Sequence, residues 1–215
     1  WSSDVCSSDL SRASLIQQLE TYELVWSDEF NDEALDQAKW RYRYLGPRHG
    51  GVNVKDTVTF DDNGHLVLST KNVDDKYHTA MIGTQGTYQA KYGYFEARIK
   101  LQQQVGHWSA FWLQSKKYSK GVGDTAVYGA EIDIFEYLQK EGDTIRHALH
   151  WDGYKEEHKS KGKRVNVEGL TKGWHTVGLL WTKDSYTFYI DGEETWHTSK
   201  AVSNQSQYII LSLEV

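Results

Sequence analysis

Several residue types that would define other classes of protein are nearly missing from this chain. Its 215 residues include one cysteine and one proline, Pro47. A single cysteine excludes an internal disulfide and a cysteine-rich metal site. Because the apolar runs are only a few residues long, the sequence predicts no membrane-spanning helix. The net charge of −6 argues against nucleic acid as a partner, since binding to phosphates needs a basic surface.

Aromatic side chains, in contrast, are abundant. The chain has nine tryptophans and 14 tyrosines. Flat rings fill cores, line interfaces and stack on bases or sugars, and base stacking fits poorly with the acidic charge. We expect core packing to occupy more than half of these rings, which leaves the others as candidates for sugar binding.

The start of the chain differs from the rest. Residues 1–20 are expected to be a leader or an appended segment, and the first ten resemble a tag. The segment 14–22 has apolar side chains at helical spacing and opens with a capping-box pattern at Ser14 and Gln17. These features predict a short amphipathic helix before a single domain at residues 21–215.

Short alternating segments separated by turns predict an all-β protein. Residues 93–101 place apolar side chains on one face and polar side chains on the other. Residues 174–181 and 186–190 flank a turn, and a further turn at 61–64 precedes another strand. Turns at intervals of about ten residues are typical of an antiparallel β-sandwich. No linker or internal repeat interrupts this pattern.

The acidic segment 130–138 is the most informative part of the sequence. In a regular strand, Glu131 and Asp133 share one face, and Glu136 points to the opposite, apolar face. Burying an unpaired carboxylate on that face costs several kcal/mol. One extra residue, a β-bulge near Phe135, returns Glu136 to the face of the other two acids. The sequence therefore predicts three carboxyl groups in a row.

Three neighbouring carboxyl groups repel one another and usually persist where their protonation is used. Paired carboxylates are the catalytic groups of glycoside hydrolysis, and a separation of about 5 to 5.5 Å suits the retaining, two-step mechanism. The pattern alone leaves two other interpretations open. These are a solvated acidic surface and a calcium site built from oxygen ligands.

Three further residues are candidates for substrate binding. Trp108 and Trp112 share one strand face, which suits a platform for sugar rings. His150 shares a face with Arg146 on the segment that follows the acidic strand, while apolar residues take the other face. Core packing is an equally good interpretation of the tryptophans, and a position at the core edge is the simpler one for His150.

These motifs together resemble glycoside hydrolase family 16, the group of laminarinases, lichenases, agarases and carrageenases. Segment 131–136 fits the family pattern Glu-x-Asp-x-x-Glu in its bulged form. The resemblance extends from Tyr22 to Val215. Further matching segments, in the expected order, are 26–30 with Trp40, 92–98, 108–112, and Trp174 with 191–192.

The resemblance implies a concanavalin A-like jelly roll with an open cleft on its concave face. It also implies retaining endo-hydrolysis of a β-linked polysaccharide by a catalytic domain at residues 21–215. The implied roles are nucleophile for Glu131 and general acid/base for Glu136. Asp133 is expected to assist by hydrogen bonding to Glu131. No cofactor or metal is expected.

Two features depart from the family pattern. Residues 79–84 contain no arginine, where many β-1,3-glucanases of the family have one, so laminarin is less clearly the substrate. The final strand of the family follows the segment that here is 211–215, at which this chain ends. We therefore expect the domain to lack that strand and to expose a sheet edge.

The favoured substrate is a β-1,3 or β-1,3/1,4-glucan. The alternatives are an agarase- or carrageenase-type galactan hydrolase, a transglycosylase, and a non-catalytic carbohydrate-binding lectin on the same fold. The basic loop 155–164 is a candidate contact for an anionic sugar, although a solvated charged loop is the simpler interpretation. The expected partner is the polysaccharide, with no nucleic acid and no membrane. We expect a monomer that works outside the cell, although this chain shows no signal peptide.

Overall fold

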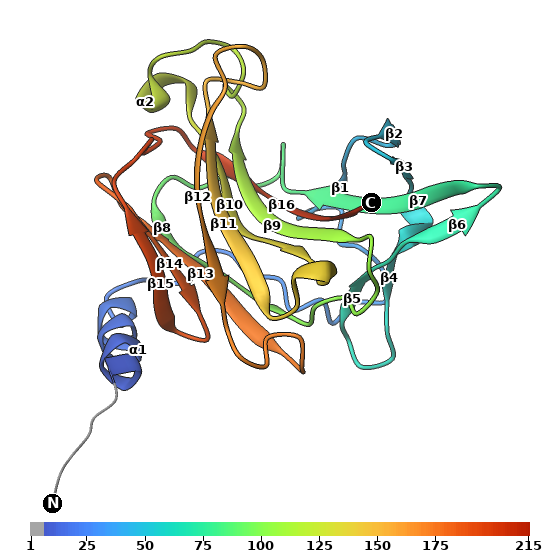
Figure 1. Cartoon of the computed structure of the whole chain (residues 1–215), viewed down its shortest axis with the longest axis horizontal. Coiled ribbons are helices and arrows are strands. Elements are labelled where there is room, and N and C mark those ends of the chain that lie inside the picture. The colour runs from blue at the N-terminus through green and yellow to red at the C-terminus, as the bar shows by residue number, and fades with distance from the viewer. Residues whose placement is uncertain (1–6) are drawn as a thin grey trace, which may run out of the picture.

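The computed structural model describes residues 7–215, which are built mainly from short strands (Figure 1). The helical elements are α1 (Ser7–Leu19), α2 (Thr125–Tyr128) and the two short 3-10 turns η1 (Lys55–Thr57) and η2 (Gln139–Glu141). The first strands are β1 (Arg41–Tyr42), β2 (Gly46–Arg48), β3 (Gly51–Asn53), β4 (Val58–Phe60), β5 (Leu66–Leu68), β6 (Lys71–Val73), β7 (Lys76–Gly83) and β8 (Gly93–Ile99). The later strands are β9 (Trp108–Ser115), β10 (Glu131–Leu138), β11 (Thr144–Trp151), β12 (Lys159–Asn166), β13 (His175–Trp181), β14 (Tyr186–Ile190), β15 (Glu193–Thr198) and β16 (Gln207–Glu214). Within the described residues, no helix has the length and apolarity needed to span a membrane.

The strands form two sheets that pack against each other (Figure 1). The larger sheet has the order β12-β11-β10-β9-β16-β7-β3-β2, and β1 and β6 also pair with β7. The smaller sheet has the order β15-β14-β13-β8, and β4 pairs with β5 as a separate ribbon. Neighbouring strands are antiparallel, except that β3 runs parallel to β7. This arrangement confirms the predicted antiparallel β-sandwich.

The core lies between the two sheets because the strands alternate apolar and polar side chains. Ile132 and Leu149 project from the larger sheet into the same apolar cluster as Leu179, Trp181 and Phe188 of the smaller sheet. All five side chains are completely buried. Burying each such side chain contributes roughly 1.5–3 kcal/mol, so this layer supplies much of the driving force for folding.

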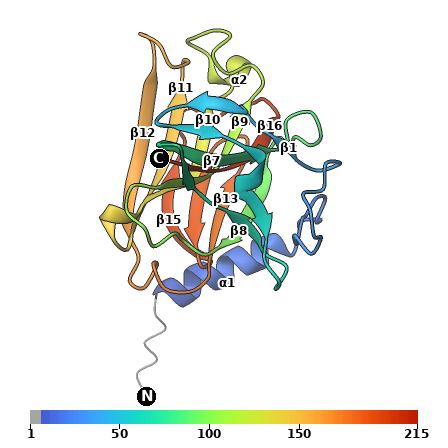
Figure 2. The ribbon, with the colours of Figure 1, turned by 90° about the vertical axis from the view of Figure 1, so that its right-hand side faces the viewer.

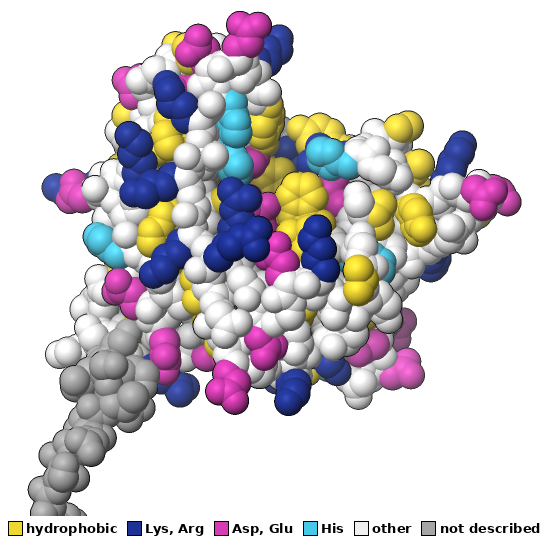
Figure 3. Space-filling view, in the orientation of Figure 1, with side chains coloured by type: hydrophobic (Ala, Val, Ile, Leu, Met, Phe, Trp, Pro, Cys, Tyr) yellow, Lys and Arg dark blue, Asp and Glu magenta, His cyan; other side chains and the backbone are white. Residues whose placement is uncertain are grey.

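The opposite face of the larger sheet is concave and open. Figure 3 shows histidine, acidic and hydrophobic side chains gathered in this hollow. Cross-strand pairing explains the gathering, because residues directly opposite each other share a face. Glu131 pairs with Gln114 of β9 and with His150 of β11, and Glu136 pairs with Ala110 and Arg146. The sheet thus forms the floor of the predicted cleft.

Helix α1 lies against the outer face of the smaller sheet (Figure 2). Leu15 is 4% exposed and packs against Leu180 and Tyr189. The predicted helix is therefore present, but its amphipathic character is weak because Ile16 is exposed, and the predicted capping box is wrong. The helix begins at Ser7, so Ser14 lies inside it rather than at its start. Of the segment predicted to be a tag, residues 1–6 lie outside the described residues.

The basic segment 155–164 is largely a strand, which corrects the expectation of a basic loop at the cleft. Strand β12 pairs with β11 so that Lys161 lies opposite Leu149 and Lys163 lies opposite His147. Both partners are completely buried on the core side of the sheet, so these lysines lie on the side away from the cleft. Arg164, which pairs with Arg146, lies on the cleft side.

Candidate active site

A β-bulge in strand β10 places the three carboxyl groups on one face. Asp133 lies opposite Trp112 of β9, but the next pair joins Phe135 to Phe111, so two residues of β10 span one step of β9. Ile134 is the extra residue, and it points with Phe135 into the core. Glu136 therefore returns to the cleft face. The bulge predicted from the acidic pattern is confirmed.

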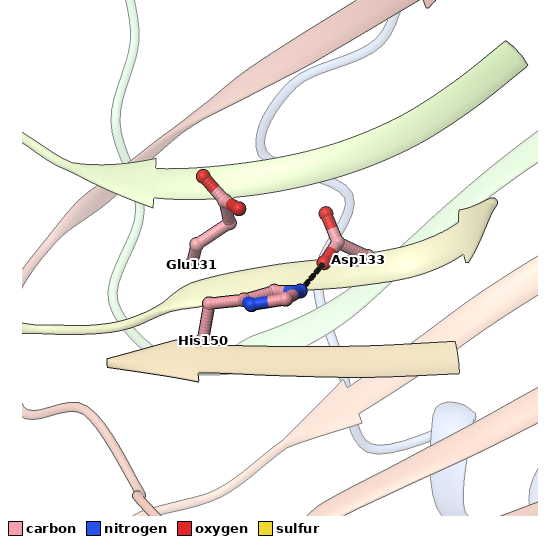
Figure 4. A group of neighbouring side chains, drawn as sticks. All are labelled: Glu131, Asp133 and His150. Atoms are coloured by element: carbon pink, nitrogen blue, oxygen red, sulfur yellow. Dashed lines mark ion pairs between the residues drawn. The ribbon is translucent and has the colours of Figure 1, made fainter. Parts of the chain in front are cut away.

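The three carboxyl groups are buried at the floor of the cleft. Glu131, Asp133 and Glu136 are 8%, 5% and 8% exposed. Figure 4 shows the Glu131 and Asp133 side chains on the same side of β10, with His150 reaching toward them from β11. Keeping several acids in so little water is unfavourable unless some of them hold a proton, so this cluster is arranged for proton chemistry.

Glu131 has two hydrogen-bond donors on one oxygen. The Gln114 side-chain amide donates to Oε2 at 2.8 Å, and the Tyr154 hydroxyl donates to the same atom. Burial raises the pKa of Glu131 to about 7, while the two donors and the positive charge of Arg48 oppose that rise. Glu131 is thus a member of the cluster whose ionised form is stabilised by hydrogen-bond donors.

Asp133 lies between the two glutamates along the strand. Burial raises its pKa well above the usual range, and the charges of Glu136 and Glu131 add to the rise. Its Oδ2 atom is 3.4 Å from Nε2 of His150. The hydrogen bond expected between Asp133 and Glu131 is not formed within residues 7–215, where the donors to Glu131 are Gln114 and Tyr154. Asp133 influences its neighbours through charge and through His150.

Glu136 borders a pocket at one end of the carboxyl row. The pocket is lined by Trp108, Glu136, Leu138, Glu141, Arg146 and Arg164. Burial raises the pKa of Glu136, and the positive charge of Arg146, whose Nε lies 3.9 Å from Oε2, opposes the rise. A carboxyl group whose pKa is raised and that faces an open pocket is suited to protonate a leaving group there.

His150 lies in the site, as the sequence predicts. Its Nδ1 atom is 2.9 Å from Nε2 of His158, and the two rings are stacked. Burial, together with the nearby His158 and Arg146, lowers the pKa of His150 to about 4. His150 is therefore neutral at neutral pH and offers a hydrogen bond to Asp133 or to a bound sugar.

The two candidate tryptophans have different surroundings. Trp112 is 6% exposed and packs with Met81, Tyr208 and Ile210, and its indole N–H donates to Ser212 at 3.2 Å. It is therefore part of the cleft floor and is packed more tightly than a free platform, and its contact with sugar stays a prediction. Trp108 is half-buried and lines the pocket beside Glu136. It remains a candidate for sugar stacking.

We expect Trp108→Ala and Trp112→Ala to fail in different ways. Removing Trp112 should lower the free energy of unfolding by about 3–5 kcal/mol, because it leaves a cavity among buried neighbours. Removing Trp108 should weaken polysaccharide binding while lowering Tm much less. Thermal melts and affinity gel electrophoresis of both variants would check this. A large loss of Tm with unchanged binding in Trp108→Ala would show that Trp108 is structural.

Two residues at Glu131 were missed by the sequence analysis. Gln114 lies on the same face of β9 as Trp108 and Trp112, because alternate residues of a strand point to the same side. The alternation along this strand could therefore have identified it from the sequence. Tyr154 lies in the connection between β11 and β12, and its sequence neighbours give no sign of the contact. Only the folded chain brings this tyrosine to the carboxyl group.

The cluster also resembles a cation site in one respect. Glu131, Asp133 and His150 each bring one oxygen or nitrogen atom within 4.8 Å of the others. Calcium prefers six to eight oxygen ligands, so a set of two carboxyls and an imidazole does not match the calcium alternative.

A curved β-sandwich with a row of carboxyl groups along an open cleft defines the class of protein as a glycoside hydrolase. Residues 48–212 match the family model for Glycosyl hydrolases family 16. The chain belongs to this family, and the resemblance noted from the sequence is confirmed.

Individual relatives agree with this assignment. The crystal structure of a laminarinase from Flavobacterium sp. UMI-01 superposes with a TM-score of 0.75 at 26% identity, covering 89% of this chain and 87% of that one. Glucan endo-1,3-beta-glucosidase A1 of Niallia circulans is 26% identical over 89% of this chain but only 33% of its own length. Keratan-sulfate endo-1,4-beta-galactosidase of Sphingobacterium multivorum is 25% identical over 79% of this chain and 42% of its length. The chain thus spans less than half the length of these two curated relatives.

Proposed function

We propose that this chain is an endo-acting, retaining hydrolase of a β-1,3 or mixed β-1,3/1,4-glucan. The observation that carries the proposal is the bulge that brings Glu131, Asp133 and Glu136 onto one face of β10. Family membership and the names of the glucanase relatives support the choice of substrate. A lectin would need no such carboxyl row, so the non-catalytic alternative is disfavoured.

The reaction proceeds in two displacements. In the first, a carboxylate oxygen of Glu131 bonds to the anomeric carbon while Glu136 gives its proton to the departing glycosidic oxygen. In the second, Glu136, now ionised, takes a proton from water, and that water displaces Glu131 from the sugar. The charge of Glu136 raises the pKa values of both Asp133 and Glu131. When Glu136 loses its proton, the protonation of these two neighbours therefore changes with it.

The open cleft supports attack within a polysaccharide chain rather than at its end. One chain supplies all three carboxyl groups, so we propose a monomer. We also propose that the enzyme acts outside the cell, because a long polysaccharide does not pass through a membrane. Detection of the protein and its activity in culture supernatant, rather than in lysed cells, would test the location.

A second candidate substrate is an anionic galactan. Arg146 and Arg164 both line the pocket beside Glu136. Guanidinium groups bind sulfate and carboxylate groups well, and one relative is named for keratan sulfate. Arg164 is also paired with Glu141 at 2.8 Å, which neutralises part of this charge. The glucan therefore remains the first choice.

The deciding experiment is product analysis on a polysaccharide panel. Laminarin, mixed-linkage glucan, agarose, carrageenan and keratan sulfate would each be incubated with the protein. We expect oligosaccharides of several lengths early in the reaction on a glucan, and proton NMR should show the β-anomer first. Initial release of the α-anomer would contradict the retaining mechanism. Products longer than the starting polysaccharide chains would indicate transglycosylation.

A further inference from the structure

A buried arginine lies behind the carboxyl row without an acidic partner. Arg43 is 6% exposed, and no described carboxylate lies within ion-pair distance of it. Its Nη2 atom donates to the Tyr208 hydroxyl at 3.0 Å and to Oε1 of Gln114 at 3.1 Å. Nη2 also contacts the Tyr44 hydroxyl at 3.1 Å, and Nη1 donates to Gln85. A buried cation held by neutral groups is costly and calls for a functional explanation.

The contacts of Arg43 fix the orientation of one amide. Oε1 of Gln114 accepts from Arg43 at 3.1 Å and from the Tyr208 hydroxyl at 2.6 Å. Arginine has no acceptor atom, so the oxygen of Gln114 must face it. The amino group of Gln114 must then face the other way, where it donates to Oε2 of Glu131 and to the Tyr154 hydroxyl, both at 2.8 Å.

We propose that Gln114 is a positioning residue for Glu131, and that Arg43 and Tyr208 hold its amide in the orientation that donates to this carboxylate. The inference rests on the proposed function, because it takes Glu131 as the nucleophile. Chains of hydrogen bonds polarise one another, so the charge of Arg43 strengthens the donor that reaches Glu131.

The arrangement distinguishes the two glutamates. Both donors to Glu131 meet at Oε2, which leaves Oε1 to face the anomeric carbon. Glu136 has weaker support: its Oε2 is buried without a hydrogen-bond partner among residues 7–215, Arg146 remains 3.9 Å away, and the Trp108 side chain opposes the rise in its pKa. Donors stabilise the charged form of a carboxyl group, so Gln114 and Tyr154 oppose the rise that burial gives to the pKa of Glu131.

Several other ionisable groups face Glu131, and all contribute to its titration. They come from every element packed against it: Asp133 and Glu136 on β10, His150 on β11, Tyr118 and Tyr154 in connecting segments, Arg48 on β2, Tyr208 on β16, and Arg43 after β1. Substituting Gln114 removes no ionisable side chain, but it takes one hydrogen-bond partner from Arg43, Tyr208 and Tyr154. A shift in that variant therefore reports the loss of the amide together with these contacts.

The test compares Gln114→Met with wild type and with Gln104→Met, the same change at an exposed glutamine. A hydrogen bond to a charged group corresponds to roughly a 10- to 100-fold effect, or about one to two pH units. We expect Gln114→Met to lower kcat by that factor, with KM changed less than about threefold. The acidic limb of its kcat/KM profile should move upward by about one unit, because the donor no longer favours ionised Glu131. Gln104→Met should match wild type.

Tyr208→Phe provides a second arm, because it removes one donor to Gln114 and preserves the ring. Alone, it should move the acidic limb in the same direction by a smaller amount. In the Gln114→Met background it should have no further effect, since Tyr208 acts through the amide. Additive effects of the two substitutions would overturn the proposed relay.

A direct titration separates this proposal from the proposed function. The carboxyl carbon of Glu131 can be followed by NMR in protein labelled with 13C-glutamate, with Glu131→Gln identifying the signal. We expect its pKa to be higher in Gln114→Met than in wild type, even if no polysaccharide is cleaved. An unchanged pKa in a folded variant would overturn the proposal. An inactive wild type with the expected shift would instead count against the proposed function.

Discussion

Glu131→Gln is expected to abolish polysaccharide cleavage while leaving the fold intact. The amide cannot form the covalent bond to the anomeric carbon, so we expect the rate to fall by at least about 10³-fold. The substitution keeps the size of the side chain and an oxygen that can accept from Gln114 and Tyr154. Initial rates on the preferred glucan and affinity gels on the same glucan would check both expectations. We expect binding to persist after turnover is lost.

The same variant gives a pH-dependent change in stability. The pKa of Glu131 in the folded protein, about 7, lies above its ordinary value of 4.5. A raised pKa contributes stability that is fully present below the unfolded pKa and is lost as the pH rises through the folded pKa. Glutamine cannot ionise, so Glu131→Gln should melt close to wild type at about pH 4 and above it beyond about pH 7.

Glu193→Gln is the matched control, since it makes the same chemical change at an exposed position on the smaller sheet. It should leave both activity and the pH dependence of Tm unchanged. A Glu131→Gln variant that keeps a tenth of the wild-type rate, equivalent to about 1.4 kcal/mol of barrier, would remove Glu131 as nucleophile.

The sequence predicts those parts of the site that depend on local rules. Strand alternation would have buried Glu136 among apolar side chains, so a bulge was required, and the register shift of β10 supplies it. The pair β13 and β14 follows from two alternating segments around one turn. His150 was found because it alternates with apolar residues that face the core.

The rest of the site depends on contacts between distant segments. Gln114 meets Arg43 and Tyr208 only because β16 is inserted beside β9 in the larger sheet. The same insertion places Ser212 of β16 beside Trp112, whose indole N–H donates to it, and so packs Trp112 into the floor of the cleft. Strand order is a property of the whole fold, and no local pattern in the sequence indicates it.

Glu136→Ala is expected to separate the two displacements. With polysaccharide, the loss of the proton donor should lower the rate by about 10²- to 10⁴-fold. An aryl glycoside has a leaving group that needs little protonation, so the variant should still form the bond to Glu131 and then stall, because no base activates water. Burst kinetics would show one rapid turnover followed by a slow phase.

Azide provides the decisive measurement on Glu136→Ala, because it attacks the glycosyl-enzyme without a base. We expect added azide to restore turnover on the aryl glycoside and to give a β-glycosyl azide, identified by NMR. An α-glycosyl azide would mean a single inverting displacement.

The raised pKa of Glu136 should also produce the basic limb of the wild-type pH profile, and that limb should be absent from the variant. Glu136→Gln preserves the volume of the side chain and serves as a second variant in case Glu136→Ala does not fold. If both variants are folded and azide rescues neither, Glu136 is not the acid/base. Loss of fold in both would make Glu136 a structural residue of the bulge, and the proton donor would then have to come from another group in the cleft.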